Sequence, residues 1–200
     1  MHMIPHLQKG VKELKLPSFN PYYVPNAHIT SSWMNGTFSN LTMGYTNNYN
    51  IKFVQMNLDE NPFIKTEYVH PHLELNAHYE LYGSLQQLRL HGEGEFELTL
   101  NDTTSTLMLE AHKIKRNGKE YMKIDKATYK ITDTNILYVN LHNLFGNNQE
   151  LTDRINALFL QDKQVYYEEF SPLVEKIVQE ICHSWFKGVF DTFSLDELFD

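Results

Sequence analysis

Histidines and carboxylates along one short stretch are the residues of this sequence with the clearest potential for chemistry. His70, His72, Glu74 and His78 lie at even spacing, and residues at even spacing share one face of a β-strand. Imidazole and carboxylate groups are common ligands of divalent metals. Side chains two positions apart on a strand nevertheless diverge from a compact tetrahedron unless another element supplies a further ligand. We therefore interpret these residues as a solvated sheet face and expect no metal site.

Motifs for nucleophilic catalysis and phosphate binding are missing from the sequence. It contains no Gly-x-Ser-x-Gly pattern, which would present a reactive serine. Cys182, the only cysteine, lies within an apolar stripe, whereas a reactive thiol needs an electropositive site. Gly92-Glu93-Gly94 has an acidic residue where a phosphate would need amides or cations. We expect neither an enzyme nor a bound cofactor.

Composition narrows the remaining classes. With 200 residues, 42% of them hydrophobic, the chain has the size of one domain with a substantial core. Seventeen Lys and Arg against 25 Asp and Glu give a net charge of −8, which argues against nucleic-acid partners and anionic membrane surfaces. No segment has the roughly eighteen unbroken apolar residues of a membrane span, and no signal peptide is visible. We expect a monomer with little affinity for membranes.

The pattern of residues 29–141 predicts an antiparallel sheet, preceded by an irregular, proline-rich segment over residues 1–28. From Val69 to Leu81 every second residue is apolar, which predicts a strand with one dry face. Asn101-Asp102 and Asn117-Gly118 are predicted turns. A change of apolar phase at Asp125-Lys126 predicts a β-bulge.

Helical spacing of apolar residues follows over residues 147–192. We predict a long helix there, kinked or divided near Pro172, because proline cannot continue a helix without disturbing it. Its apolar arc widens after Pro172, so it needs apolar surroundings on more than one side. In a chain of this length only the sheet can supply them. The expected fold is therefore a single α+β domain, a long C-terminal helix wrapped by a highly curved antiparallel sheet.

An apolar space between the helix and the dry sheet face would bind a ligand by removing its surface from water. Its expected wall combines inward strand residues with the wide face of the helix, and Tyr129 would give a ligand oxygen one directed hydrogen bond. The alternative for each of these residues is that it simply packs in the core. The candidates are Phe96, Leu98, Leu100, Leu107, Leu109, Tyr129, Ile177, Ile181, Trp185 and Phe186.

Several motifs resemble those of the insect haemolymph juvenile hormone-binding protein and Takeout family. Residues 117–124 are similar to the family hairpin NGKxYLKV, and residues 141–151 to its turn LxNLFNGNKEL. Residues 155–160 resemble the helix start xNxFLNEN, and residues 195–199 the ending YDELFP. The resemblance covers the whole chain and is strongest beyond residue 115.

The resemblance implies a secreted carrier of small lipophilic molecules without catalytic residues. It also implies a front end that this sequence lacks, comprising a signal peptide, a first helix and a pair of disulfide-forming cysteines. Asn35, Asn40 and Asn101 begin acceptor triplets for N-glycosylation. Two other functions stay open: a protein that engages lipid surfaces, as immune-type lipid-binding proteins do, and a truncated form that binds nothing.

Overall fold

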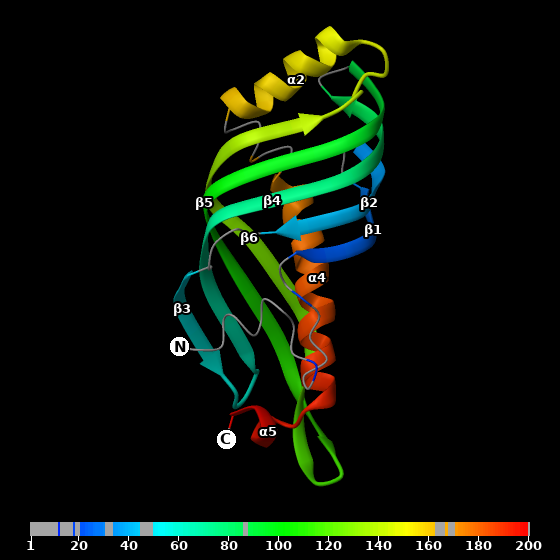
Figure 1. Cartoon of the computed structure of the whole chain (residues 1–200). Helices are drawn as coiled ribbons and strands as arrows, with labels where there is room; N and C mark the ends of the chain where they lie inside the picture. Colours follow the sequence, from blue (N-terminus) through cyan, green and yellow to red (C-terminus); the bar gives the residue numbers. More distant parts are fainter. Residues whose placement is uncertain are drawn as a thin grey trace.

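The structure is a computed structural model that describes residues 12, 18, 21–30, 34–44, 50–85, 88–162, 167 and 171–199. In the described part of the chain, six strands are followed by three helices (Figure 1). The elements are β1 (Tyr22–Thr30), β2 (Met34–Gly44), β3 (Asn50–Asn57), β4 (Phe63–Leu85), β5 (Leu88–Arg116), β6 (Lys119–Leu141), α2 (Gln149–Gln161), α4 (Ser171–Thr192) and α5 (Leu195–Phe199).

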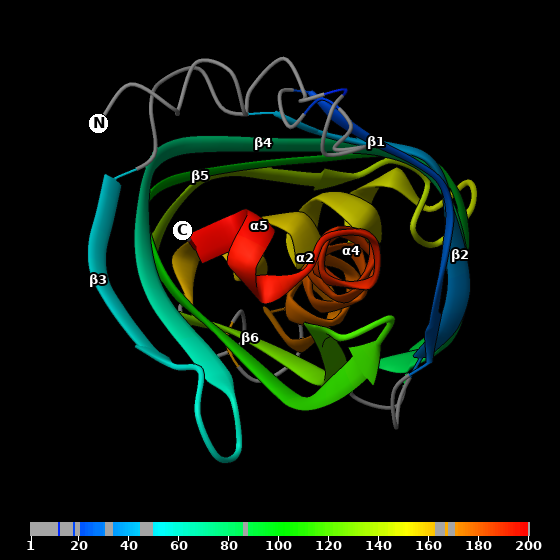
Figure 2. The ribbon, with the colours of Figure 1, turned by 90° about the horizontal axis from the view of Figure 1, so that it is seen from below.

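All described strands belong to one antiparallel sheet in the order β1-β2-β4-β5-β6. β3 lies off this path, because it pairs with the first part of β4 while β2 pairs with the second part. Viewed along the molecule, the sheet curls around α4 and α5 (Figure 2). This arrangement confirms the predicted fold, a C-terminal helix wrapped by a curved antiparallel sheet.

A coordinated bend crosses β4 and β5 and changes which residues face inward. His70 and Leu73, three positions apart, both face the interior, and so do their partners Thr103 and Leu100. The register between the two strands stays unchanged through the bend. Pro71, with its fixed φ and no N–H, and Asp102, with φ 47°, mark the place where both strands turn.

This bend corrects two predictions. The continuous dry face from Val69 to Leu81 is wrong at its start: the buried alternation begins at Leu73, and before the bend the inward residues are those at even positions. The predicted turn at Asn101-Asp102 is also wrong, since β5 runs through it from Leu88 to Arg116. An Asp with a left-handed backbone conformation inside a strand bends the chain without reversing its direction.

Two local predictions are confirmed. Asn117 and Gly118 both have positive φ, 51° and 81°, as a type I′ hairpin turn requires. The register shifts between Glu110–Lys126 and Ala111–Ile124, so Asp125 is the extra residue of a β-bulge. The bulge lets β6 keep an apolar inner face on both sides of the phase change.

The N-terminal boundary differs from the prediction. β1 begins at Tyr22, inside the segment 1–28 that we expected to be irregular, and Pro25 lies within it. β1 is an edge strand of the sheet, where a proline without an N–H is tolerated. Of residues 1–20, only Lys12 and Ser18 are among the described ones.

Within the described part of residues 147–192 there are two separate helices, so of the two expected forms the divided one is found and one continuous kinked helix is not. α2 begins at the Asn148 cap, whose side chain accepts from the Leu151 N–H, and it ends where Asp162 turns to an extended conformation. Pro172 is the second residue of α4, a position that needs no N–H partner. α2 lies across the upper end of the molecule, while α4 runs through its middle (Figure 1).

Side chains of α4 cover the free edge of β6. Glu175 accepts the backbone N–H of Ile131 at 2.9 Å, and Gln179, one turn later, accepts that of Tyr129 at 3.4 Å. Glu175 is only 6% exposed, and Lys130 Nζ lies 2.6 Å from its carboxylate. An exposed strand edge invites pairing with other chains, so these contacts both fix α4 and protect the edge.

Glycines allow the turn after β6 to lie directly on β5. A Cβ on Gly94 would overlap the carbonyl oxygen of His142, and one on Gly92 would lie 2.7 Å from Leu144 Cα. Asn156 of α2 accepts from the Leu141 N–H at 3.1 Å and donates to Asn140 Oδ1 at 2.7 Å. The upper end of the sheet is thereby closed by the turn and α2.

Candidate ligand-binding cavity

The lower half of the molecule encloses a cavity of about 510 Å³, within the range of small-molecule sites. Its wall combines the inner faces of several strands with one face of α4 and the short helix α5. The lining residues are Met43, Ile51, Val54, Met56, Ile64, Tyr68, His70, Leu73, Leu107, Tyr129, Val178, Ile181, Cys182, Trp185, Phe186, Val189, Phe190, Leu198 and Phe199.

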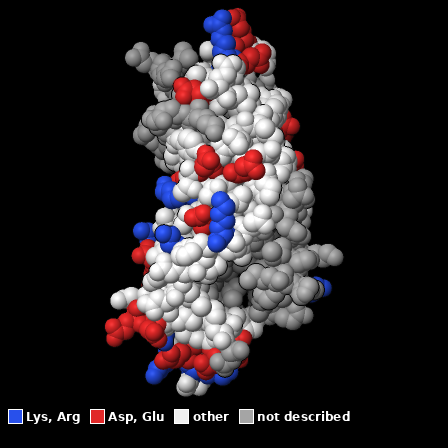
Figure 3. All heavy atoms as spheres, turned by 90° about the vertical axis from the view of Figure 1, so that its left-hand side faces the viewer, with Lys and Arg blue, Asp and Glu red and all other residues white. Residues whose placement is uncertain are grey.

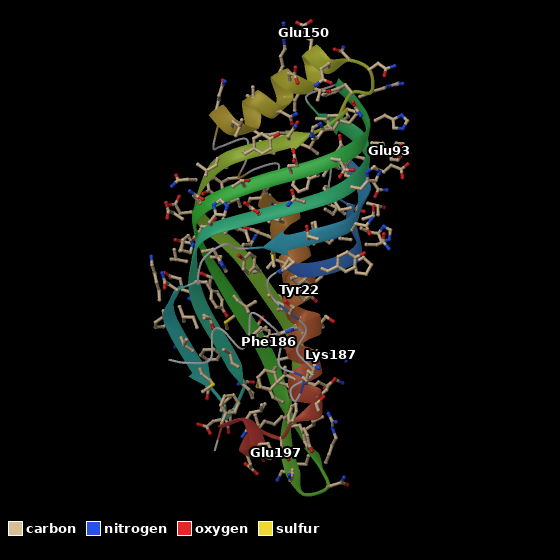
Figure 4. The ribbon with its side chains drawn as sticks, in the orientation of Figure 1. Tyr22, Glu93, Glu150, Phe186, Lys187 and Glu197 are labelled. Carbon is tan, nitrogen blue, oxygen red and sulfur yellow. The ribbon has the colours of Figure 1, made fainter. Side chains whose placement is uncertain are left out.

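α4 presents one continuous side to the cavity. Ile181, Trp185 and Val189 recur at helical spacing, so they project from the same face of the helix. Phe186 lies on the cavity side of α4, whereas Lys187 points away from it (Figure 4). The rings of Trp185 and Phe186 meet edge to face, with centroids 5.0 Å apart. This arrangement makes an aromatic wall of defined shape.

The cavity opens between β3 and α5. Val54, Met56 and Phe199 line it, yet they are 54%, 45% and 44% exposed. β3 is exposed along nearly its whole length because it pairs with β4 alone among the described strands. On the face that carries β3, charged side chains lie at the two ends and across the middle, and a largely uncharged area separates the middle group from the lower end (Figure 3). Because Val54, Met56 and Phe199 are themselves apolar, an apolar molecule would meet an apolar entrance.

α5 closes the lower end and is held by an ion pair and a helix cap. Lys119 Nζ lies 2.9 Å from the Glu197 carboxylate, beside the β5–β6 hairpin (Figure 4). The Ser194 N–H and hydroxyl both donate to Glu197 at 2.8 Å. The Lys119 ammonium, with Ser194, lowers the pKa of Glu197 to about 2. The position of α5 thus depends on contacts outside the cavity wall.

A few uncharged polar side chains lie among the apolar ones. Burial lowers the pKa of His70 to about 4, raises that of Cys182 to about 12 and raises that of Tyr129. Tyr68 stacks on His70 with ring centroids 6.0 Å apart. His70, Cys182 and Tyr129 are therefore neutral near pH 7. These side chains can exchange hydrogen bonds with a ligand.

Comparison with known proteins identifies the family. Across residues 1–200 the sequence matches the family model described as haemolymph juvenile hormone binding protein (JHBP). The chain belongs to this family. Its fold is one that binds hydrophobic ligands.

Individual relatives agree with this assignment. The circadian clock-controlled protein daywake of Drosophila melanogaster is 27% identical over 133 residues, which cover 65% of this chain and 50% of that protein. Daywake of Drosophila yakuba is 24% identical over 131 residues, which cover 64% and 50%. The chain spans about half the length of these curated relatives.

The crystal structure of Takeout 1 from Epiphyas postvittana has the same fold, with a TM-score of 0.77. Its sequence is 21% identical, and the match covers 98% of this chain and 90% of that one.

Five of the ten residues predicted to bind ligand lie together on the cavity wall of this juvenile hormone-binding family member. They are Leu107, Tyr129, Ile181, Trp185 and Phe186. The other five are buried but do not line this cavity. They are Phe96, Leu98, Leu100, Leu109 and Ile177. Phe96, for example, packs edge to face on Phe38, with centroids 5.3 Å apart. Ligand contact by any of the ten stays a prediction.

Sequence reasoning missed His70, Tyr68 and the inner face of β3. We predicted that His70 and His72 share the solvated face, but the bend at Pro71 places them on opposite faces of the sheet. The two histidines therefore do not share a face on which both could bind one metal ion. Among the described residues, no group of three His, Cys, Asp or Glu side chains could hold a metal ion. For β3, the available signal was the pair of apolar residues Val54 and Met56, two positions apart in the sequence.

The predicted acceptor asparagines differ in their surroundings. Asn35 and Asn40 on β2 are exposed, and Asn40 accepts a hydrogen bond from Tyr23 at 2.9 Å. Asn101 is partly buried, with its Oδ1 2.7 Å from His72 Nδ1. N-glycosylation of this family member stays a prediction. Within the described part of the chain, no helix is long and apolar enough to cross a membrane.

Proposed function

We propose that this protein is a non-enzymatic carrier of a small lipophilic molecule, such as a juvenile hormone-like terpenoid, a fatty acid or an odorant. It would act outside the cell and hold its ligand away from water and from degrading enzymes. The observation that carries this proposal is the cavity of about 510 Å³ between α4 and the lower half of the sheet. Family membership supports the same function.

Cavity size fits this class of ligand. At about 30 Å³ per non-hydrogen group, the share of a water molecule in the liquid, the cavity holds on the order of seventeen such groups. Each buried methylene contributes roughly 0.8 kcal/mol, against a cost of association of at least about 4 kcal/mol. Dissociation constants in the micromolar range or below are therefore expected for ligands with a chain of about fifteen or more carbons, taking ~8 kcal/mol as micromolar.

A blocked cavity tests the proposal. Ile181→Trp should fill the space beside Cys182 and abolish saturable binding of a fluorescent lipophile such as N-phenyl-1-naphthylamine. Glu180→Trp is the matched control, because it adds the same side chain one residue away on an exposed position of α4. We expect the control to bind as the unaltered protein does. If the unaltered protein shows no saturable binding of this probe, of a terpenoid ester or of a fatty acid, the carrier proposal is wrong.

A second candidate function is ligand exchange at a lipid surface. Phe53 is 48% exposed on the outer side of β3, next to the exposed entrance residues Val54 and Met56. Exposed apolar groups of this kind mark surfaces that contact proteins or membranes. Flotation with zwitterionic vesicles separates the two functions: a carrier that does not engage lipid stays at the bottom, while a lipid-engaging protein floats and loses flotation in Phe53→Ser.

A further inference from the structure

Apart from the Trp185 indole on α4, the polar groups in the cavity wall are gathered at its inner end. Tyr68 and His70 lie on β4 just before the bend, and their rings stack on each other. Tyr129 of β6 lies near both Tyr68 and Cys182. Each of these four residues lines the cavity.

The sheet beneath this cluster is also polar on its inner face. Ser105, paired with Tyr68 across the ladder, and Thr103, paired with His70, are both completely buried. Thr103 shares a 2.7 Å hydroxyl contact with Thr134 of β6. Farther along β5 the inward positions become Leu107 and Leu109. Hydroxyl groups therefore occupy the inward positions of β5 beside the cluster, and leucines occupy those farther along the strand.

The outer end of the cavity is apolar. Phe190 lies eight residues beyond Cys182 on α4, which corresponds to about 12 Å along the helix. Val189, Phe190 and Phe199 line this end, and Phe190 stacks on Phe199 with centroids 6.5 Å apart. Across from them, Met56 of β3 pairs with Ile64 of β4. The cavity thus has a polar inner end and an apolar outer end at the entrance.

We infer that Tyr68, His70 and Tyr129 form a headgroup site, and that the cavity selects amphiphiles with one uncharged oxygen-bearing group, bound with that group inward and the hydrocarbon chain toward the entrance. This inference rests on the proposed carrier function and specifies its ligand class. Alcohols, esters, ketones and epoxides match the hydrogen-bonding groups of the site.

The surroundings of His70 explain why the headgroup is uncharged. They hold its pKa at about 4, so the protein there disfavours a positive charge because burial removes water from it. Burial disfavours a carboxylate in the same way. A neutral imidazole still offers one donor and one acceptor, which complement the phenol groups beside it.

Ligands of equal chain length test the inference. Displacement of N-phenyl-1-naphthylamine would be measured for tetradecan-1-ol, methyl tetradecanoate, tetradecanoate and tetradecane at pH 7.5. We expect the alcohol and the ester to bind at least tenfold more tightly than the alkane and than the ionised acid. Equal binding of all four, or tightest binding of the carboxylate, overturns the inference while leaving the carrier function intact. Failure of all four to displace a bound probe counts against the carrier function itself.

Variants assign the selectivity to the headgroup site. Tyr129→Phe and His70→Phe should each reduce the alcohol-to-alkane ratio about fivefold, as expected for one lost hydrogen bond, with little effect on alkane binding. Val189→Ala at the apolar end is the control, and it should weaken alcohol and alkane by the same factor. A ratio that neither Tyr129→Phe nor His70→Phe changes would place the headgroup elsewhere and overturn the assignment.

A ligand labelled at one end tests the orientation. 12-(1-Pyrenyl)dodecan-1-ol keeps its hydroxyl and carries the fluorophore at the far end, so its fluorophore can lie in the open entrance. 1-Dodecylpyrene has the same chain without the hydroxyl. We expect the pyrenyl alcohol to bind at least tenfold more tightly than 1-dodecylpyrene, and we expect Tyr129→Phe to reduce this advantage about fivefold. Equal affinity of the two compounds would contradict head-inward binding.

Discussion

Acidification should destabilise the protein through His70 before the carboxylates are protonated. The ordinary pKa of a histidine is 6.5, and burial lowers that of His70 to about 4. Between these values the unfolded chain binds a proton that the folded protein does not. Stability is therefore complete above pH 6.5 and is lost as the pH falls toward 4.

The magnitude follows from the pKa. A difference of one in pKa corresponds to about 1.4 kcal/mol, so the fall from pH 6.5 to pH 5 should remove about 2 kcal/mol through His70. For a chain of this size the melting temperature changes by about 2–4 °C per kcal/mol, which gives a decrease of about 4–8 °C. Glu197, with a pKa of about 2, contributes below pH 4.5, outside this interval.

The assay is thermal unfolding followed by circular dichroism at pH 7, 6 and 5, for the unaltered protein and His70→Phe. The phenylalanine keeps a ring beside Tyr68 and removes the titrating group, so the melting temperature of His70→Phe should change less with pH.

His72→Gln is the matched control from the same strand. The hydrogen bond from His72 to Glu74 raises the pKa of His72, so His72 stabilises the fold below pH 6.5 and ceases to do so as pH rises through its own pKa. His72→Gln should therefore lose more stability on acidification than the unaltered protein. Parallel pH profiles for the unaltered protein and His70→Phe would refute the reasoning.

Three further predictions concern other parts of the structure. Glu175→Ala removes a buried carboxylate that accepts a β6 N–H, and chemical denaturation should show a loss of about 3 kcal/mol, with a smaller loss for Glu175→Gln. Gly94→Ala places a methyl group against the His142 carbonyl and should cost about 1–3 kcal/mol by the same measurement, whereas Gly118→Ala, with open space around it, should act through its backbone conformation alone. Burial raises the pKa of Cys182 from 9.0 to about 12, so a disulfide reagent at pH 8 should modify the native protein at least roughly a thousandfold more slowly than the unfolded chain; equal rates would mean that the thiol is exposed.

Local chemistry in the sequence predicted those features that depend on neighbouring residues. Asn117-Gly118 requires positive φ at both positions, and few other turns match that pair. The bulge at Asp125 follows from a change of apolar phase within one strand. Both are visible over fewer than ten residues, and both are confirmed. The curved sheet around a C-terminal helix was predicted from longer patterns and from the family resemblance.

Features that depend on the path of the sheet were not visible. Alternation shows which residues share a face only while the strand keeps a regular twist. At the bend near Pro71 the inward-facing positions change from even-numbered to odd-numbered residues. His70 was therefore assigned to the wrong side. Gly92 and Gly94 have the pattern of a turn or a strand start, but their role is to admit the backbone at residues 142–144. Such a contact joins segments about fifty residues apart, and no local pattern contains it.

The same limit explains why only half of the predicted wall lines the cavity. Phe96 and Leu107 have equivalent inward positions on β5, yet they meet different neighbours. Around Phe96 the interior contains the rings of Phe38 and Tyr79, with Phe38 and Tyr79 centroids 6.2 Å apart, and α2 adds the buried Phe159 across the upper end. Around Leu107 the wall consists of α4 and the small helix α5, and the edge strand β3 leaves an opening. Where the helices cover the sheet incompletely, an inward apolar residue borders the cavity. Where α2 covers the sheet, such a residue packs in the core. The positions of the helices, rather than the strand pattern, therefore determine where a ligand can bind.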